Sequence, residues 1–301
     1  DELKTIATFY QSPAGQKFSD AFKAVATSPL LWAFLALMTV TMSLELGPNR
    51  WIPAVLEAGG LPGILVLVLI NGVMAITRAN AHAILARVSP PMVLMVGTRV
   101  AGLGLLALSF SGGTVATVAS ALVFAIGIAI VWPTMMGFVA ERAPRTGARG
   151  LGLMAAAGSL AVGIVTTPLL GQIADKHLPD TLDPPAVTAL AREVMASPTA
   201  KPAPLEAAAG AVAASSGPLP AAATGDFLRR TAAGEAGPAL ASKAAPVLAA
   251  AENKSGLLSF RYLVPFAFGV CLIFGLVVLS DRRAGGYQAQ VAKARLVSDA
   301  Q

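Results

Sequence analysis

The sequence has 301 residues, of which 55% are hydrophobic and 13% charged, and its formal net charge is +6. An ordinary soluble domain has about 25% charged residues, so this composition excludes a soluble globular protein, a disordered chain and a nucleic-acid-binding array. One cysteine and two histidines allow no internal disulfide and provide too few ligands for a metal cluster. We therefore expect an integral membrane protein with no metal, no other cofactor and no nucleic-acid partner.

Residues 1–29 form a polar segment with three lysines. We predict a cytoplasmic linker here, with a short amphipathic helix around residues 15–26. The chain begins at Asp1 rather than methionine, and no signal-peptide pattern follows. From this start we expect a processed or truncated chain.

Six apolar runs follow, each long enough to cross about 30 Å of hydrocarbon. Breakers rich in glycine and proline separate them, for example at residues 59–63 and 144–150. The runs lack the alternation of an outer-membrane barrel, so helices must satisfy the backbone in lipid. The predicted fold is an all-α membrane protein with transmembrane helices at 30–56, 62–86, 92–111, 114–140, 150–173 and 260–280. The first five helices thus occupy residues 30–173.

The distribution of Lys and Arg predicts the orientation of these helices. If the first helix runs outward, the inner segments, including the tail 281–301, contain eleven Lys and Arg, and the two short outer loops contain none. Positive charge in short loops marks the cytoplasmic side. We expect both termini in the cytoplasm of a bacterial-type inner (plasma) membrane.

Segment 174–259 then lies on the extracytoplasmic side. It is rich in alanine and proline, and few large apolar residues are available to close a core. We expect a flexible, partly helical insertion, either a tolerated insertion or a cap that captures solute.

Polar residues inside a bilayer are costly, so each one is a candidate for function. In the first predicted helix, Thr41, Glu45 and Asn49 are four residues apart and share one face. Glu45 is the candidate to carry or gate a proton. The alternative is that Glu45 pairs with Arg50 and only stabilises the end of the helix.

In the second predicted helix, Asn71, Arg78 and His82 share a face, which favours an aqueous cavity beside it. We expect Arg78 to bind solute or to neutralise Glu45. The alternative is that Arg78 and His82 extend to the inner headgroups.

The fourth and fifth predicted helices have small and polar residues seven positions apart, which indicate either close helix packing or a cavity-lining face. In the fourth helix these accompany Trp132. In the fifth they are Gly152, Ser159 and Thr166. Trp132, Ser159 and Thr166 complete the candidate binding residues.

Enzyme motifs are missing from this inventory. An intramembrane serine protease needs Gly-x-Ser-Gly and a later histidine in the membrane, and Ser159 has neither companion. Phosphate-binding Gly-x-x-x-x-Gly-Lys loops do not occur. We expect no enzymatic activity.

Residues 141–150 have the sequence Glu-Arg-Ala-Pro-Arg-Thr-Gly-Ala-Arg-Gly, with Trp-Pro-Thr at 132–134 before and Thr-Pro-Leu-Leu-Gly at 167–171 after. This resembles the tenth and eleventh helices of the major facilitator superfamily. By this resemblance, the six helices form the carboxy-terminal half of a twelve-helix transporter. The helices at 30–56, 62–86, 114–140 and 150–173 then line its central cavity, and an amino-terminal six-helix half is missing.

The resemblance implies a secondary transporter in the lipid bilayer that moves a small polar organic solute, such as a sugar, by alternating access. Proton-coupled symport is our first expectation. The alternatives are a proton-coupled efflux antiporter and a non-transporting membrane sensor or scaffold.

Overall fold

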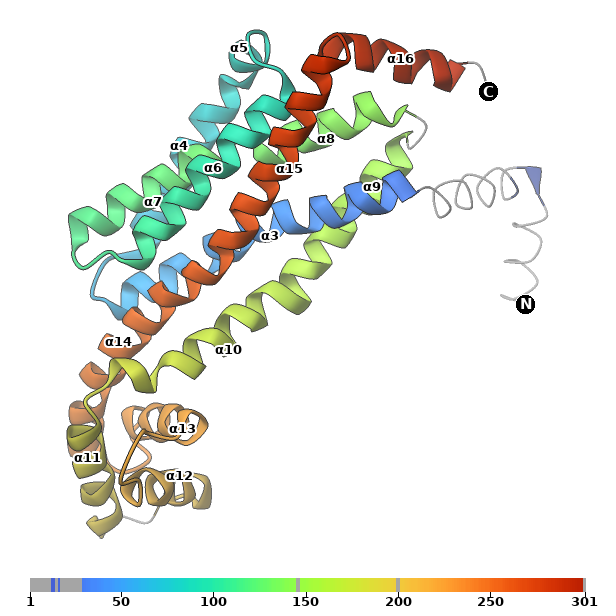
Figure 1. Ribbon diagram of the computed structural model, residues 1–301. Helices are drawn as coiled ribbons and strands as arrows, with labels where there is room; N and C mark the ends of the chain where they lie inside the picture. The colour runs from blue at the N-terminus through green and yellow to red at the C-terminus, as the bar shows by residue number, and fades with distance from the viewer. Residues whose placement is uncertain (1–11, 14–15, 17–28, 145–146, 199–200, 300–301) are drawn as a thin grey trace.

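The computed structural model describes residues 12–13, 16, 29–144, 147–198 and 201–299. All regular elements in these residues are helices, and Figure 1 shows an elongated bundle with a smaller helical unit at one end. The predicted linker 1–29 and its helix at 15–26 lie almost wholly outside the described residues.

Each of the six predicted segments is helical. They correspond to α3 (Pro29–Ala58); α4 (Gly63–Ala79) with α5 (Ala81–Leu85); α6 (Pro90–Ser109); α7 (Thr114–Ile128) with α8 (Val131–Arg142); α9 (Gly147–Ala161), η2 (Val162–Thr166) and α10 (Thr167–His177); and η4 (Arg261–Leu263) with α15 (Val264–Arg283). The last segment continues α14 (Pro238–Phe260), and a final helix, α16 (Tyr287–Asp299), follows it.

Four of the described helical stretches are long and apolar enough to cross a membrane: Pro90–Ser109, Thr114–Arg142, Gly147–His177 and Pro238–Arg283. The 30-residue α3 contains Glu45 and Arg50, and α4 is apolar but has 17 residues. The all-α class with membrane-spanning helices is therefore confirmed. Membrane crossing by α3 and α4 stays a prediction.

Prolines explain two of the interruptions in the predicted segments. A proline has no N–H to donate to the carbonyl four residues earlier. Pro133 therefore leaves the carbonyl of Ala129 without its helical partner, and α7 ends at that point. Pro168 has the same effect on Ile164, which lies in the π-helical turn η2. Such turns often occur at functional sites.

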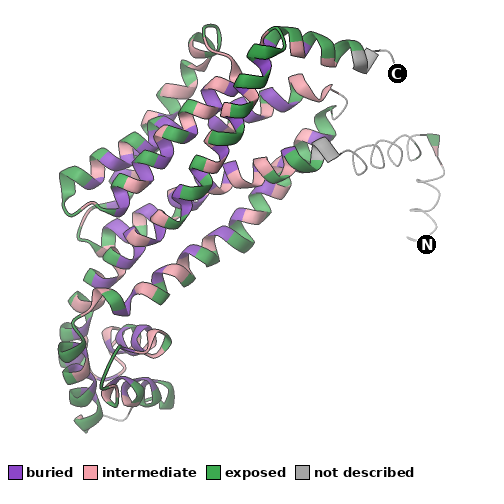
Figure 2. Cartoon of the chain, viewed as in Figure 1, coloured by how far each residue is buried: buried purple, intermediate pink, exposed green. Residues whose placement is uncertain are grey.

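The bundle core forms where α6 packs against α7 and α15, and where α3 packs against α4, α8 and α9. Glycine permits the closest approach, because a Cβ on Gly127 would lie 2.3 Å from the backbone nitrogen of Ala101. Phe124, Phe260 and Phe274 are fully buried in this core. By contrast, α9 packs mainly on α3 and exposes its opposite face (Figure 2).

Residues 178–259, here called the cap, form a second packed unit. Its helices are α11 (Pro184–Ala196), α12 (Ala203–Ala213), α13 (Ala221–Ala232) and most of α14. Phe227 and Leu228 are fully buried at its centre, and Ala191, Ala209 and Ala244 are fully buried around them. The expectation of a flexible segment was wrong, because ten Leu, Val and Phe side chains are buried together with six alanines in this core.

Candidate functional site

Glu45 and Arg78 form an ion pair between α3 and α4, with Arg78 Nη2 donating to Glu45 Oε1 at 2.5 Å. The partner of Glu45 is thus Arg78 rather than Arg50. The Glu45 side chain is 8% exposed and that of Arg78 is 37% exposed. Each charge alone costs about 2.5–3.5 kcal/mol at the centre of a membrane helix, so pairing offsets much of that cost.

A backbone carbonyl completes the binding of Arg78. Its Nε donates to the carbonyl oxygen of Ala129 at 2.7 Å. This is the carbonyl that Pro133 leaves without a helical donor. Arg78 of α4 therefore binds both Glu45 of α3 and the chain between α7 and α8.

The second carboxylate oxygen of Glu45, Oε2, is buried and makes no hydrogen bond within the described part of the chain. A buried acceptor without a donor is costly, typically about 1–3 kcal/mol. A proton or a solute hydroxyl at this oxygen would remove that cost. One oxygen of Glu45 is therefore bound to Arg78, and the other is available to accept a hydrogen bond.

One turn further along α3, Asn49 Nδ2 donates to Asn71 Oδ1 across 3.4 Å. Asn71 also donates to the Leu67 carbonyl of its own helix at 2.9 Å. Asn49 Oδ1 is buried and accepts no hydrogen bond from a described residue. Asn49 and Asn71 thus extend the polar contact between α3 and α4.

Thr41 and Thr166 are buried, and the hydroxyl group of each donates a hydrogen bond to another residue of the bundle. Thr41 donates to the Met38 carbonyl at 2.9 Å within α3. Thr166 donates to the hydroxyl of Ser43 at 2.8 Å and so joins η2 to α3. The sequence pattern missed Ser43, which lies off the face of Thr41 and Glu45.

The remaining candidates lie at the edges of this site. Trp132 is half-buried in α8, and its Nε1 donor has no acceptor among the described residues. Ser159 is exposed on α9 and lies outside the contacts that involve Glu45. His82 is also exposed, on the short helix α5 that follows Asn80.

A second charged cluster joins α8, α15 and α16, and the sequence prediction did not include it. Arg142 binds Asp281 and lies 5.1 Å from the ring centre of Tyr287. The Tyr287 hydroxyl donates to Glu141. Burial, the hydrogen bond to Glu141 and its negative charge raise the pKa of Tyr287 far above its usual range. The aromatic ring of Phe138 connects this cluster to the bundle core.

The contacts between α3 and α4 bring charged and polar side chains together. No group of three or more His, Cys, Asp or Glu side chains among the described residues has the arrangement of a metal site. The arrangement instead places a carboxylate with a free oxygen, a guanidinium and two carboxamides along neighbouring helices.

A sequence model described as the Major Facilitator Superfamily matches residues 4–176, which is more than half of the chain. The chain belongs to the major facilitator superfamily. Members of the major facilitator superfamily are transporters, so this protein is an integral membrane transporter whose substrate is a solute. The match ends at the end of α10, so the cap and α15 lie outside it. No curated protein and no solved structure matches the chain.

Proposed function

We propose that this transporter moves a small polar organic solute, such as a sugar, together with a proton. The ion pair between Glu45 and Arg78 supports this proposal most strongly, because it is buried, joins two helices and leaves one carboxylate oxygen unused. Intramembrane carboxylates with a cationic partner commonly serve as proton relays in transporters.

In this proposal, Glu45 binds the coupling proton. Protonation removes the negative charge and weakens the contact with Arg78. Arg78 stays attached to the Ala129 carbonyl at 2.7 Å, so its outer nitrogen turns toward a solute oxygen without leaving the site. Asn49 and Asn71 supply further donors and acceptors for hydroxyl groups, which suits a polyhydroxylated solute.

We further propose that a second six-helix half covers this face. In this fold the solute site lies between two halves, and one half rocks against the other. A Cβ added at Gly72 of α4, or at Gly152 and Gly163 of the α9–η2 stretch, would meet no atom within 4 Å. Exposed Asn71 and Ser159 lie on the same two helical stretches. These open positions leave room for another helical surface to pack on α4 and on the α9–η2 stretch.

Reconstitution tests this requirement for a second half. Residues 1–301 alone in proteoliposomes should give no saturable uptake, whereas co-reconstitution with an amino-terminal half should give uptake. Saturable, protonophore-sensitive uptake by residues 1–301 alone would contradict the proposal.

The orientation we propose has both termini in the cytoplasm of an inner (plasma) membrane, with the cap outside. The excess of Lys and Arg in the inner segments supports it. Labelling of single cysteines introduced in the cap and in α16 of a Cys271→Ser variant tests it. An impermeant reagent added to intact cells should label the cap position and not the α16 position.

Uptake by the full-length gene product, with and without a protonophore, tests the coupling. Accumulation of a sugar that collapses on protonophore addition supports symport. Efflux that collapses instead supports a proton-coupled antiporter. If a panel of solutes gives neither, the alternative of a membrane sensor or scaffold replaces the proposal.

A further inference from the structure

The outer end of α3 is fixed to the cap by α14. Asn253 Nδ2 donates to the carbonyl oxygen of Val55 at 2.7 Å. This carbonyl lies in the last turn of α3, where helical carbonyls have no partner in their own helix. Gly256, one turn later in α14, permits the contact, because a Cβ there would lie 2.5 Å from a methyl group of Val55.

The outer end of α10 is fixed to the same helix. Arg229 of α13 donates to Asp175 of α10 at 2.5 Å and to Glu252 of α14 at 3.1 Å. Burial opposes the charge of Arg229, but the hydrogen bonds to both carboxylates outweigh it and raise its pKa. Beside this network, His177 at the end of α10 lies 2.7 Å from the hydroxyl of Tyr262.

The cap has a packed core of its own beside these contacts. Its buried core includes Phe227 and Leu228 of α13, immediately before Arg229. In addition, α14 continues through the short turn η4 into α15, as Figure 1 shows. The cap therefore joins the outer ends of three helices of the bundle, α3, α10 and α15.

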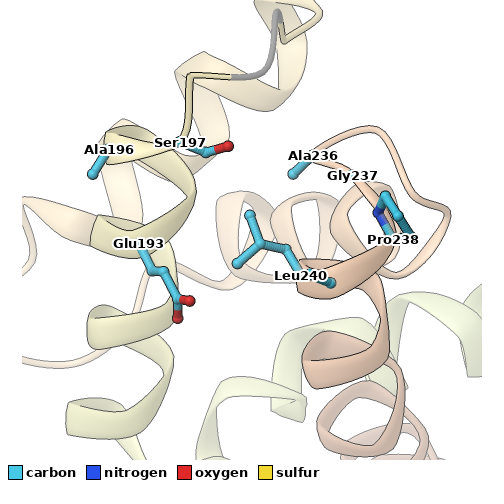
Figure 3. Close-up of a pocket in the computed structure, with 8 residues that line it drawn as sticks. Glu193, Ala196, Ser197, Ala236, Gly237, Pro238 and Leu240 are labelled. Atoms are coloured by element: carbon cyan, nitrogen blue, oxygen red, sulfur yellow. The ribbon is translucent and has the colours of Figure 1, made fainter.

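A hollow of about 420 Å³ lies in the cap, but its position and chemistry do not suit solute capture (Figure 3). It lies beside Pro238, at the start of α14, and so roughly 22 Å along the helix from the contact of Asn253 with α3, at 1.5 Å per residue. Its lining is mainly alanine, glycine and proline, and its carboxylate, Glu193, already binds Lys243 at 2.5 Å. A structural role therefore suits the cap better than a second binding site.

We propose that the cap is an outer brace, which holds the outer ends of α3 and α10 together throughout the transport cycle. This inference rests on the proposed transport function. The helices that meet the solute then move as one body with the cap, and the cap does not open as a lid.

A disulfide between α3 and the cap tests the brace directly. The Cγ of Asn253 lies 2.8 Å from the position of a Cβ on Gly59. Since Cγ is one bond from Cβ, cysteines at both positions have Cβ atoms no more than about 4.3 Å apart, within the range for a disulfide. Cys271 is the single cysteine of these 301 residues, so Cys271→Ser removes their competing thiol, and any cysteine in the remainder of the gene product is replaced by serine as well.

In this background we expect the Gly59→Cys/Asn253→Cys variant of the full-length gene product to cross-link almost completely under mild oxidation. Transport by the cross-linked protein should stay within about twofold of its own reduced form. The two single-cysteine variants, treated in the same way, control for effects of the oxidant and of each substitution.

Three other outcomes have distinct meanings. If cross-linking abolishes transport and reduction restores it, the cap moves as a lid and the brace is wrong. If little cross-link forms in folded protein, the contact itself is wrong. If neither the parent nor the reduced variant transports any solute, the proposed function fails, and complete cross-linking still supports the fixed contact between α3 and the cap.

Discussion

The ion pair between Glu45 and Arg78 predicts an asymmetry between its two single neutral variants. In Arg78→Gln, Glu45 keeps its charge in a buried position, and losing the partner of a buried ion costs about 3–5 kcal/mol. In Glu45→Gln, Arg78 keeps the Ala129 carbonyl and more than a third of its side chain is exposed. Solvent screening therefore reduces the second cost to about 1–2 kcal/mol.

The double variant separates charge from packing. With glutamine at both positions, Glu45→Gln removes the uncompensated charge that Arg78→Gln creates, so the double variant should be more stable than Arg78→Gln alone. Thermal unfolding in detergent measures this, at roughly 2–4 °C for each kcal/mol. We expect Arg78→Gln to lower the Tm by on the order of 10 °C, and Glu45→Gln to recover part of that loss. Equal losses in the single variants that add in the double variant would refute the reasoning.

Three further predictions concern other parts of the molecule. Pro133→Ala restores an N–H that competes with Arg78 for its carbonyl acceptor, so solute uptake should fall several-fold; unchanged uptake would show that the helix interruption has no role. Thr166→Val removes the hydroxyl partner of Ser43 and should lower the free energy of unfolding by about 1 kcal/mol; a neutral or stabilising effect in chemical denaturation would contradict this contact. Because folding raises the pKa of Tyr287, its neutral hydroxyl stabilises the folded protein fully below the usual tyrosine pKa near 10. This contribution to the free energy of unfolding is lost as the pH rises above that value. Tyr287→Phe should remove this alkaline loss in a Tm-against-pH series, and an identical pH profile would argue against the hydrogen bond to Glu141.

The lengths of the apolar runs were sufficient to predict the six helices, because an apolar run that crosses lipid has few structural options. Residue periodicity added the polar faces. It also placed Glu45 and Arg78 on polar faces of consecutive helices. It left open whether Glu45 pairs with Arg50 or Arg78, because that depends on how far α3 and α4 slide along each other. The sequence alone could have predicted that the Ala129 carbonyl is available as an acceptor, because Pro133 has no N–H to donate to the carbonyl four residues earlier.

Other features depend on tertiary packing that single-sequence patterns do not contain. The cap core combines leucines and valines with alanines such as Ala191 and Ala209. An alanine-rich and proline-rich composition alone does not show whether these residues belong to a linker or to packed helices. Ser43 lies away from the polar stripe of α3 and becomes relevant through the π-helical turn that brings Thr166 to it. The contact between Tyr287 and Glu141 joins residues 146 positions apart, so no local pattern indicates it.

Transport by Glu45→Gln in the full-length gene product tests the central claim most directly. We predict that the variant loses proton-driven accumulation of solute but keeps solute exchange in a counterflow assay, because glutamine preserves the site and cannot carry the proton. Glu57→Gln, at the exposed carboxy-terminal end of α3, is the matched control and should accumulate solute normally. Normal, protonophore-sensitive accumulation by Glu45→Gln would contradict the role of Glu45 as the proton carrier.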